Sequence, residues 1–525
     1  MHPLGRQEQP PRFMRRLLRP LSLLLILPLL SCTSRVWQAR FAPPTSKVVV
    51  LDQQAPFLKC HTAAGDVYVL THWKVNEAER RVSGVGLHYD AKRARKGEGT
   101  FSLSLDEVAL FETNRPETLV NTNVVVLAVL TGVSLAATAL CLTNPKACFG
   151  SCPTFYAHDG QGQSLMAEGF SEAIAPVFEK TDVDTLYTAR PTGPRFDLRM
   201  TNEALETHAV RGVRLLAAPR PPGGRVFHTR GKYLAVRELA TPRSCQADTG
   251  DCLGAVSAVD EAEYFSPADE KDLATKETVE LVFPARAGKL GLVVGGRNSL
   301  LNTFVFYQLI AYAGTTFGDR LMQLQRAGSQ GHDLRLGMWE LLGHVEAEVL
   351  TRQGWRPMGA FSEVGPIARE VQLLPLPENL PEGEVRIRLR LTKGNWRLDY
   401  LALAELAGEV RPEALEPTRV ERAGKEDPVA LARLMNPDEY LATYPGDDYT
   451  LRFELPPGEH ELFVESRGYY YEWMREEWLP EEDEEKLMEA LFTPEQALRR
   501  LAPAFKKLEP DMERIFWESR YGRAP

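Results

Sequence analysis

Glu206 and His208 are the residues whose types and spacing come nearest to a catalytic or metal-binding pair. Because side chains alternate across a strand, these two would lie on one face, where they could hold a metal ion or position a general base. A metal site would need further ligands. A hydrogen-bonded buried histidine or a solvated strand end produces the same pattern. We favour this structural interpretation and expect no metal and no cofactor.

Other short motifs of known chemistry are absent from the sequence. It has no Gly-x-Ser-x-Gly elbow, no phosphate-binding P-loop and no His-Glu-x-x-His. The acidic run at residues 481–485 lacks the alternating ligands and central glycine of a calcium loop, so we interpret it as the solvated start of a helix. The sequence therefore favours a protein that is not an enzyme.

A cluster of aromatic and arginine residues near the C-terminus is a candidate binding site. Aromatic faces next to guanidinium donors suit sugar rings or the hot spot of a protein partner. Packing in a core is the alternative, and we favour it because consecutive tyrosines must divide between two faces of a strand. The binding candidates are Tyr469, Tyr470, Tyr471, Trp473, Trp478, Arg467 and Arg475.

The N-terminus carries an export signal. Arg15, Arg16 and Arg19 precede a mostly apolar run at residues 21–30, which ends in Leu29-Leu30-Ser31-Cys32. This resembles the lipobox of bacterial lipoproteins. The resemblance implies that Cys32 is diacylglycerated and becomes the new N-terminus. Thr33, where retained lipoproteins carry aspartate, implies transfer to the outer membrane.

Two other interpretations of the N-terminus are less consistent with the sequence. A transmembrane anchor of about ten residues would span only about 15 Å of a ~30 Å hydrocarbon core. A twin-arginine signal usually carries a polar residue where this chain has Met14. We therefore expect ordinary export and a lipid anchor.

The remaining six cysteines suit an oxidising compartment. An even number outside the cytoplasm predicts three disulfides, with 15 alternative pairings. Cys245 and Cys252 bracket a polar, turn-forming stretch and are the pair that we expect first. A redox-active or metal-binding pair is the alternative for Cys148 and Cys152, although bridging is favoured. The other disulfide candidates are Cys60 and Cys141.

A second apolar stretch complicates the membrane prediction. Residues 124–142 carry no charge, and the uncharged region extends from Leu119 to Asn144, long enough to cross a bilayer. Thr131, Ser134 and Thr138 interrupt it, and exported sequence is expected on both sides. We favour a buried or membrane-apposed helix over a transmembrane helix.

Length and composition are those of a folded, multi-domain protein. The chain has 525 residues, 44% hydrophobic and 25% charged, which suggests roughly three domains. The net charge of -9, in spite of an arginine-rich signal, argues against nucleic-acid binding. The expected divisions are a signal peptide (1–31), a β-rich domain (33–118), an apolar helix (119–145), an α/β region (146–278), a β-sandwich (279–407) and a mixed C-terminal domain (408–525).

The patterns predict an α+β protein that is mainly antiparallel β, with a central β-sandwich and a helical C-terminal segment. Short β-rich runs fill residues 47–113, and Asp159-Gly160 predicts a hairpin between 154–158 and 163–169. Ser171 is a plausible N-cap for a helix to about residue 180. Proline at the first helical position predicts helices from Pro428 and Pro494, with a further helix from about Asp511.

Strict alternation gives the clearest strand. In residues 385–391, Arg386, Arg388 and Arg390 alternate with apolar residues, so the arginines share one face. Glu346 and Glu348 alternate similarly and could face them. The turn at residues 393–395 predicts a hairpin to 397–403.

With the Gly354-Trp355 and Asn395-Trp396 turns, this region weakly resembles the jelly-roll or galactose-binding-like β-sandwiches of extracellular carbohydrate-binding modules. No binding residue is carried over from that resemblance.

These observations lead to one expectation of function. We expect a cell-envelope lipoprotein, held at the membrane by its lipid anchor, with a binding or scaffolding role toward an envelope carbohydrate or protein. The alternative is an envelope hydrolase acting on carbohydrate or peptide. Two convergent carboxylates, or Glu206 and His208 beside a third ligand, would favour the hydrolase.

Overall fold

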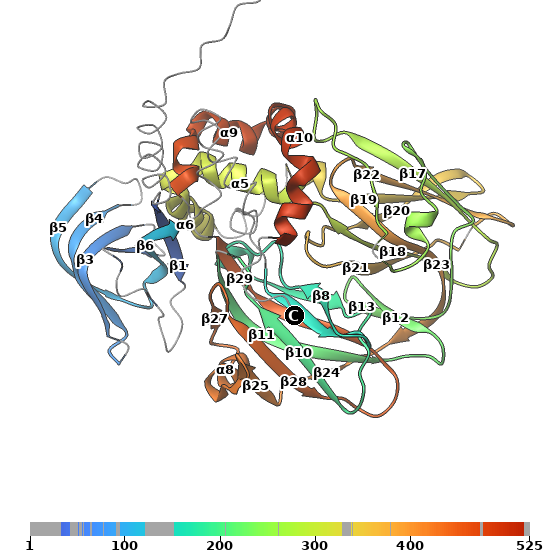
Figure 1. Cartoon of the computed structure of the whole chain (residues 1–525), viewed down its shortest axis with the longest axis horizontal. Helices are drawn as coiled ribbons and strands as arrows, with labels where there is room; N and C mark the ends of the chain where they lie inside the picture. Colours follow the sequence, from blue (N-terminus) through green and yellow to red (C-terminus); the bar gives the residue numbers. More distant parts are fainter. Residues whose placement is uncertain are drawn as a thin grey trace, which may run out of the picture.

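The chain is mainly antiparallel β, as the sequence predicted, and its described residues form five sheets (Figure 1). They belong to a computed structural model that describes residues 33–42, 51, 55, 57–62, 66–76, 78–90, 95–120, 152–204, 206–260, 262–327, 338, 340–378, 380–472 and 476–518. Cys32, Cys141, Cys148, Trp473, Arg475 and the apolar stretch at 124–142 lie outside these residues. Within them, no helix is long and apolar enough to cross a membrane.

The N-terminal sheet is formed by strands between Thr33 and Val120. Its inner residues Leu58, Cys60, Leu70 and Phe111 form a small hydrophobic core of their own. In spatial order, the strands are β1 (Thr33–Ala42), β6 (Val108–Val120), β2 (Leu58–Thr62), β3 (Val67–Asn76), β4 (Arg81–Tyr89) and β5 (Arg95–Ser104).

A first sandwich lies at the centre of the molecule, and its two sheets contribute to one hydrophobic core. Asp159-Gly160 forms the expected hairpin, with Gly160 at φ +102°. One sheet, in spatial order, contains β26 (Lys425–Glu426), β25 (Arg419–Arg422), β28 (Asp448–Glu454), β10 (Arg195–Thr201), β7 (Thr154–His158) and β8 (Gln163–Glu168). The other contains β24 (Glu413–Leu415), β11 (Glu206–Pro219), β29 (His460–Glu472) and β9 (Lys180–Thr185), with β27 (Leu441–Thr443) paired to β11.

The central sandwich divides the chain differently from the expected boundaries at residues 278 and 407. β10 pairs with β28, and β11 pairs with β29 along thirteen residue pairs. Strands from residues 154–219 and 413–472 therefore form one unit, and the strands between them fold as a second sandwich. Sequence patterns show where strands lie but not which distant strands pair.

The second sandwich confirms the predicted antiparallel β-sandwich. The side chains between its two sheets form a separate core. One sheet contains β12 (Arg225–Thr229), β13 (Lys232–Ala240), β23 (Trp396–Val410), β18 (Leu290–Asn298) and β21 (Glu370–Pro375), with β16 (Tyr264–Phe265) paired to β23. The other contains β15 (Gly250–Asp251), β14 (Ser244–Ala247), β17 (Lys276–Phe283), β22 (Val385–Thr392), β19 (Val345–Thr351) and β20 (Gly354–Phe361).

The turn at residues 393–395 does not form the hairpin that we predicted. β22 pairs with β17 and β19, whereas β23 belongs to the opposite sheet. The turn carries the chain between the two sheets. Gly394, at φ +76°, lies so close to Ala268 that a Cβ would approach its backbone nitrogen to 2.8 Å. The Asn395 amide donates a 2.7 Å hydrogen bond to the carbonyl of Leu342, which secures the crossing.

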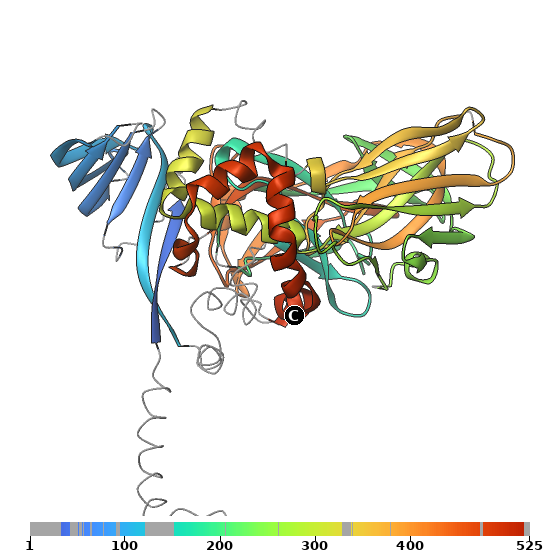
Figure 2. The same ribbon diagram turned by 90° about the horizontal axis from the view of Figure 1, so that it is seen from above.

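Helices cover the central sandwich and contribute to its core (Figures 1 and 2). The short helix from Pro428 forms as predicted, and Asp427 caps it by accepting hydrogen bonds from the backbone of Val429 and Ala430. The helix from Pro494 runs to Glu518 without a second start at Asp511. The α-helices are α5 (Leu301–Ala313), α6 (Phe317–Ala327), α8 (Pro428–Leu434), α9 (Glu484–Phe492) and α10 (Pro494–Glu518), and the short 3-10 helices are η2 (Pro176–Phe178), η3 (Gly254–Val256), η4 (Gly314–Thr316) and η5 (Glu476–Glu481).

The predicted helix from Ser171 is wrong. Only η2 forms there, and Ala175 before it is extended, at φ -161° and ψ 163°. Pro176 explains the difference because a proline disfavours helical geometry in the residue before it.

Candidate functional site

Glu206 and His208 lie side by side on β11, as the two-residue spacing predicted. The His208 Nε2 atom is 2.6 Å from the Glu206 Oε1 atom, and both side chains are almost completely buried. Tyr470 and Glu472 of β29 lie opposite them. Across the described residues, no group of three or more histidine, cysteine or acidic side chains could hold a metal. The geometry is that of a hydrogen-bonded buried histidine.

A small cavity with a mixed polar and apolar lining lies between the central sandwich, α5 and the loop that follows β20. Its volume is about 60 Å³, enough for about four water molecules or fewer, and far less than the ~300 Å³ of a typical ligand pocket. Asn302 is buried, and its amide oxygen and nitrogen have no hydrogen-bond partner among the described residues. The lining includes Cys152, Glu168, Asn302, Tyr307, Glu363, Gly365 and Tyr470.

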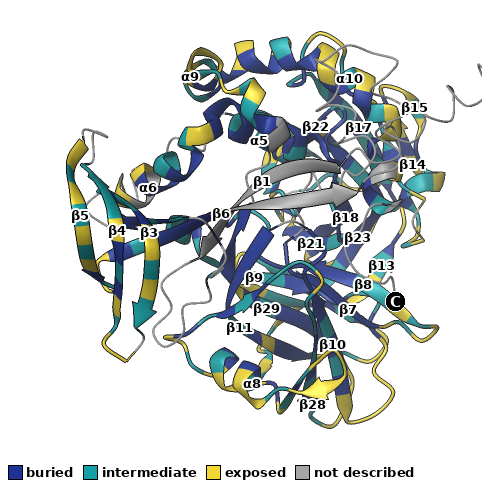
Figure 3. Cartoon of the chain, turned by 60° about the vertical axis from the view of Figure 1, so that its left-hand side comes forward, coloured by how far each residue is buried: buried dark blue, intermediate teal, exposed yellow. Residues whose placement is uncertain are grey.

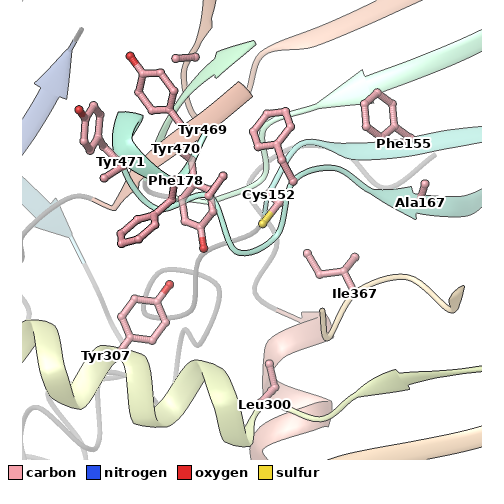
Figure 4. Close-up of a cluster of buried hydrophobic side chains, with 14 of the residues drawn as sticks. Cys152, Phe155, Ala167, Phe178, Leu300, Tyr307, Ile367, Tyr469, Tyr470 and Tyr471 are labelled. Carbon is pink, nitrogen blue, oxygen red and sulfur yellow. The ribbon is translucent and has the colours of Figure 1, made fainter. Parts of the chain in front are cut away.

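The thiol of Cys152 has low reactivity in this cavity. Burial, followed by the negative charges of Glu168 and Glu206, raises the pKa of its thiol well above the ordinary value. A thiol that stays protonated is a poor nucleophile and a poor metal ligand. Figure 4 shows Cys152 among the buried side chains of this cluster, with Tyr307 approaching from α5.

Glu168 uses its carboxylate to join the two sandwiches. Its Oε2 atom accepts a 2.8 Å hydrogen bond from the backbone of Ile367. Gly365 has a φ of +92°, and a Cβ there would lie 2.6 Å from that same oxygen. Asn298, at the end of β18, accepts from the backbone of Val364 and Gly365. The surroundings of the cavity are therefore a structural junction.

The C-terminal aromatic cluster is mainly core. Tyr469, Tyr470, Tyr471 and Trp478 are all buried. Tyr469 and Tyr471 pack edge to face, with ring centroids 5.4 Å apart. The ring centroids of Trp478 and Tyr307 are 5.1 Å apart. Consecutive tyrosines are buried because other elements cover both faces of β29. These four rings do not form an exposed binding surface.

Among the described residues of that cluster, Arg467 is exposed, and it is paired. Its Nε atom lies 2.8 Å from the Glu179 carboxylate, which also binds Arg211 and Tyr440. Arg467 therefore contributes to a surface network that ties β29 to the segment before β9.

The disulfide that we expected first is present in the structure. Cys245 and Cys252 form a disulfide. Cys60 and Cys152 are free and buried in separate hydrophobic clusters, which excludes a bond between them. The expectation that all six cysteines are bridged is therefore corrected for these two, which are buried as free thiols. Burial raises the pKa of the Cys60 thiol as well.

A partly exposed aromatic stack on the N-terminal sheet is a site that our sequence analysis missed. Tyr68 of β3 lies opposite His88 of β4, and their rings are parallel, with centroids 4.2 Å apart. Phe101 of β5 meets Tyr68 edge to face at 5.1 Å. All three residues are only half-buried. Figure 3 shows that β3, β4 and β5 are largely exposed or only partly buried.

Tyr68 and Phe101 pack against the small hydrophobic core of this sheet, and the space beside the stack is open. The His88 Nε2 atom lies 3.1 Å from the Asp66 carboxylate. A Cβ added at Gly97 or Gly99 would meet no atom within 4 Å. The arrangement offers aromatic faces beside hydrogen-bonding groups, which suits stacking against a sugar ring or an apolar side chain. Recognising it from sequence required the register that places Tyr68 beside His88, which no local motif specifies.

Comparisons with known proteins identify no relatives. No protein-family model and no curated protein matches the chain. Among solved structures, "Structure of infectious bursal disease virus Gx strain" covers 84% of this chain and 80% of its own, at 9% identity and a TM-score of 0.16. That score is too low to carry an argument about fold or function.

Proposed function

We propose that this protein is a lipid-anchored component of the bacterial cell envelope, at the outer membrane, with a binding or scaffolding role. The observation that carries the proposal is the Leu29-Leu30-Ser31-Cys32 motif after an arginine-rich segment and an apolar run. The Cys245–Cys252 disulfide supports it, because such bonds persist in exported proteins and are rare in the cytosol.

The stack of Tyr68, His88 and Phe101 is the surface that best supports binding. Its rings are accessible, whereas those of the C-terminal cluster are buried. The ligand that we favour is an envelope carbohydrate, because sugar rings pack on aromatic faces while imidazole and carboxylate groups bind their hydroxyls. His88 and Asp66 supply those two groups.

Affinity capture from a detergent-solubilised native extract tests this role. The bait is the full-length protein, compared with Tyr68→Ala and with Val85→Ala. Val85 is an exposed residue of β4 that alternates to the face opposite His88, so it controls for general changes in this sheet. We expect Tyr68→Ala to lose captured glycan and Val85→Ala to retain it. Equal capture by both variants, with equal thermal midpoints, would remove the stack from the proposal.

A further inference from the structure

Two chain segments leave the N-terminal sheet at the same place. β1 and β6 are antiparallel, and their ladder pairs Thr33 with Val120 and Ser34 with Leu119. The residues before Thr33 and those after Val120 therefore start from one rung. Figure 2 shows the two strand ends side by side, extending beyond the rest of the N-terminal sheet.

This end of the ladder is a two-stranded ribbon. β2 pairs with β6 only between Val108 and Thr113. Beyond Thr113, residues 114–120 of β6 pair with β1 alone. Seven rungs at ~3.4 Å per residue extend the ribbon about 24 Å past the paired edge of β2.

The ribbon is braced against the rest of the molecule. β1 contacts β29 and β11 of the central sandwich as well as η5. Because β1 contacts two strands of the central sandwich and a 3-10 helix, these contacts fix the direction of the ribbon relative to the central sandwich.

The sequence before Thr33 and the sequence after Val120 both contain groups that suit contact with a lipid bilayer. Cys32, the proposed acylation site, immediately precedes Thr33. The uncharged region from Leu119 to Asn144 begins at the last two residues of β6. An acyl anchor and an apolar run that start from adjacent strand ends would both be accommodated by the same bilayer surface.

We infer that the Thr33 and Val120 end of the ribbon is the membrane-facing end of the folded protein, and that its partner is the lipid bilayer itself. The inference rests on the proposed lipidation of Cys32, and it adds an orientation. The second sandwich, which contains β19 and β20, lies on the far side of the molecule from β1 (Figures 1 and 2).

Fluorescence quenching in vesicles tests the orientation. Glu117→Cys places a label on the ribbon, and Gln353→Cys places a matched label on the exposed turn between β19 and β20. Each full-length acylated variant is labelled with an environment-sensitive fluorophore and bound to phosphatidylethanolamine and phosphatidylglycerol vesicles that contain lipids with nitroxide headgroups. As a control, the unsubstituted protein is treated with the same fluorophore, which measures how far the native cysteines are labelled.

We expect the label at position 117 to be quenched at least two-fold more than the label at position 353. Equal quenching, or stronger quenching at position 353, would overturn the inference. Mass spectrometry of the N-terminal peptide in the same sample reports acylation separately. An unmodified Cys32 contradicts the proposed function, whereas acylation without a quenching difference contradicts only the orientation.

A second measurement tests the contribution of the apolar run. The chain from Thr33 onward is exported behind a signal that is not lipidated, either unchanged or with residues 124–142 replaced by a Gly/Ser linker that retains Cys141. We expect the unchanged form to float with vesicles and the linker form to remain soluble. Failure of the unchanged form to float would contradict a second lipid contact at this end.

Discussion

Arg388 of β22 lies directly opposite Glu348 of β19 on one side and Glu280 of β17 on the other. Its guanidinium is 2.7 Å from the nearer Glu280 oxygen and 3.9 Å from a Glu348 oxygen, and it also stacks over the ring of Trp355. Arg390 similarly lies opposite Glu346. The arginine face is therefore balanced by acidic neighbours within its own sheet.

Arg388→Ala should change stability only slightly. The side chain is about one-third exposed, and exposed cross-strand ion pairs contribute under about 1 kcal/mol. Thermal unfolding measures the shift, with the fully buried neighbour Leu389→Ala as the contrasting variant, expected to lose about 2–5 kcal/mol.

The same Arg388→Ala variant also tests whether this face binds a partner. We expect it to capture the same ligands as the unsubstituted protein. If the variant lost a captured partner while its thermal midpoint stayed unchanged, the result would show that the arginine face is a binding site.

This ladder illustrates which parts of the fold were predictable. Alternation of Arg386, Arg388 and Arg390 with apolar residues specifies a strand and its faces, and the alternation at Glu346 and Glu348 indicated a partner strand. The contribution of Glu280 was not predictable. It comes from a strand more than 100 residues away, and its position depends on how the sheet assembles.

In the native exported protein, the disulfide should protect Cys245 and Cys252 from alkylation. Without reduction, neither cysteine should be labelled, and Cys245→Ser with Cys252→Ser should lower the free energy of unfolding by about 2–3 kcal/mol, as expected for closure of a short loop. Peptide mapping after alkylation reads out the bond. Full labelling of both residues before reduction would show that the bond is absent from the exported protein.

Glu112 should make the N-terminal sheet sensitive to acid. Burial alone would raise the pKa of this carboxyl, but the positive charge of Lys59 and a hydrogen bond with His61 outweigh it and lower the pKa to about 2. Because the folded pKa is below the ordinary value near 4.5, the unfolded chain binds more protons between these limits. This contribution to stability is complete above about pH 4.5 and disappears as the pH falls toward 2.

Urea unfolding at several pH values, for the unsubstituted protein and for Glu112→Gln, measures this effect. Glu112→Gln should be less stable near neutral pH and should show a shallower loss of stability from pH 4.5 downward. Parallel pH profiles for the two proteins would contradict the assigned role of Glu112.

The candidate sites were less predictable than the strands, because exposure is set by tertiary packing. The composition of Tyr469, Tyr470 and Tyr471 suits binding, yet elements distant in sequence cover both faces of their strand. Tyr68 and His88 have no distinctive spacing, and only the β3–β4 register brings their rings together. Glu206 and His208 formed the expected pair because their relationship is local to one strand.

Mass spectrometry of the mature N-terminal peptide tests the central claim most directly. The protein is purified from the membranes of cells that export it, digested, and its N-terminal peptide identified by mass. We predict a chain that begins at Cys32 and carries a diacylglyceryl group on the thiol. A mature protein that retains residues before Cys32, or that carries an unmodified Cys32, would contradict the claim that this is an envelope lipoprotein.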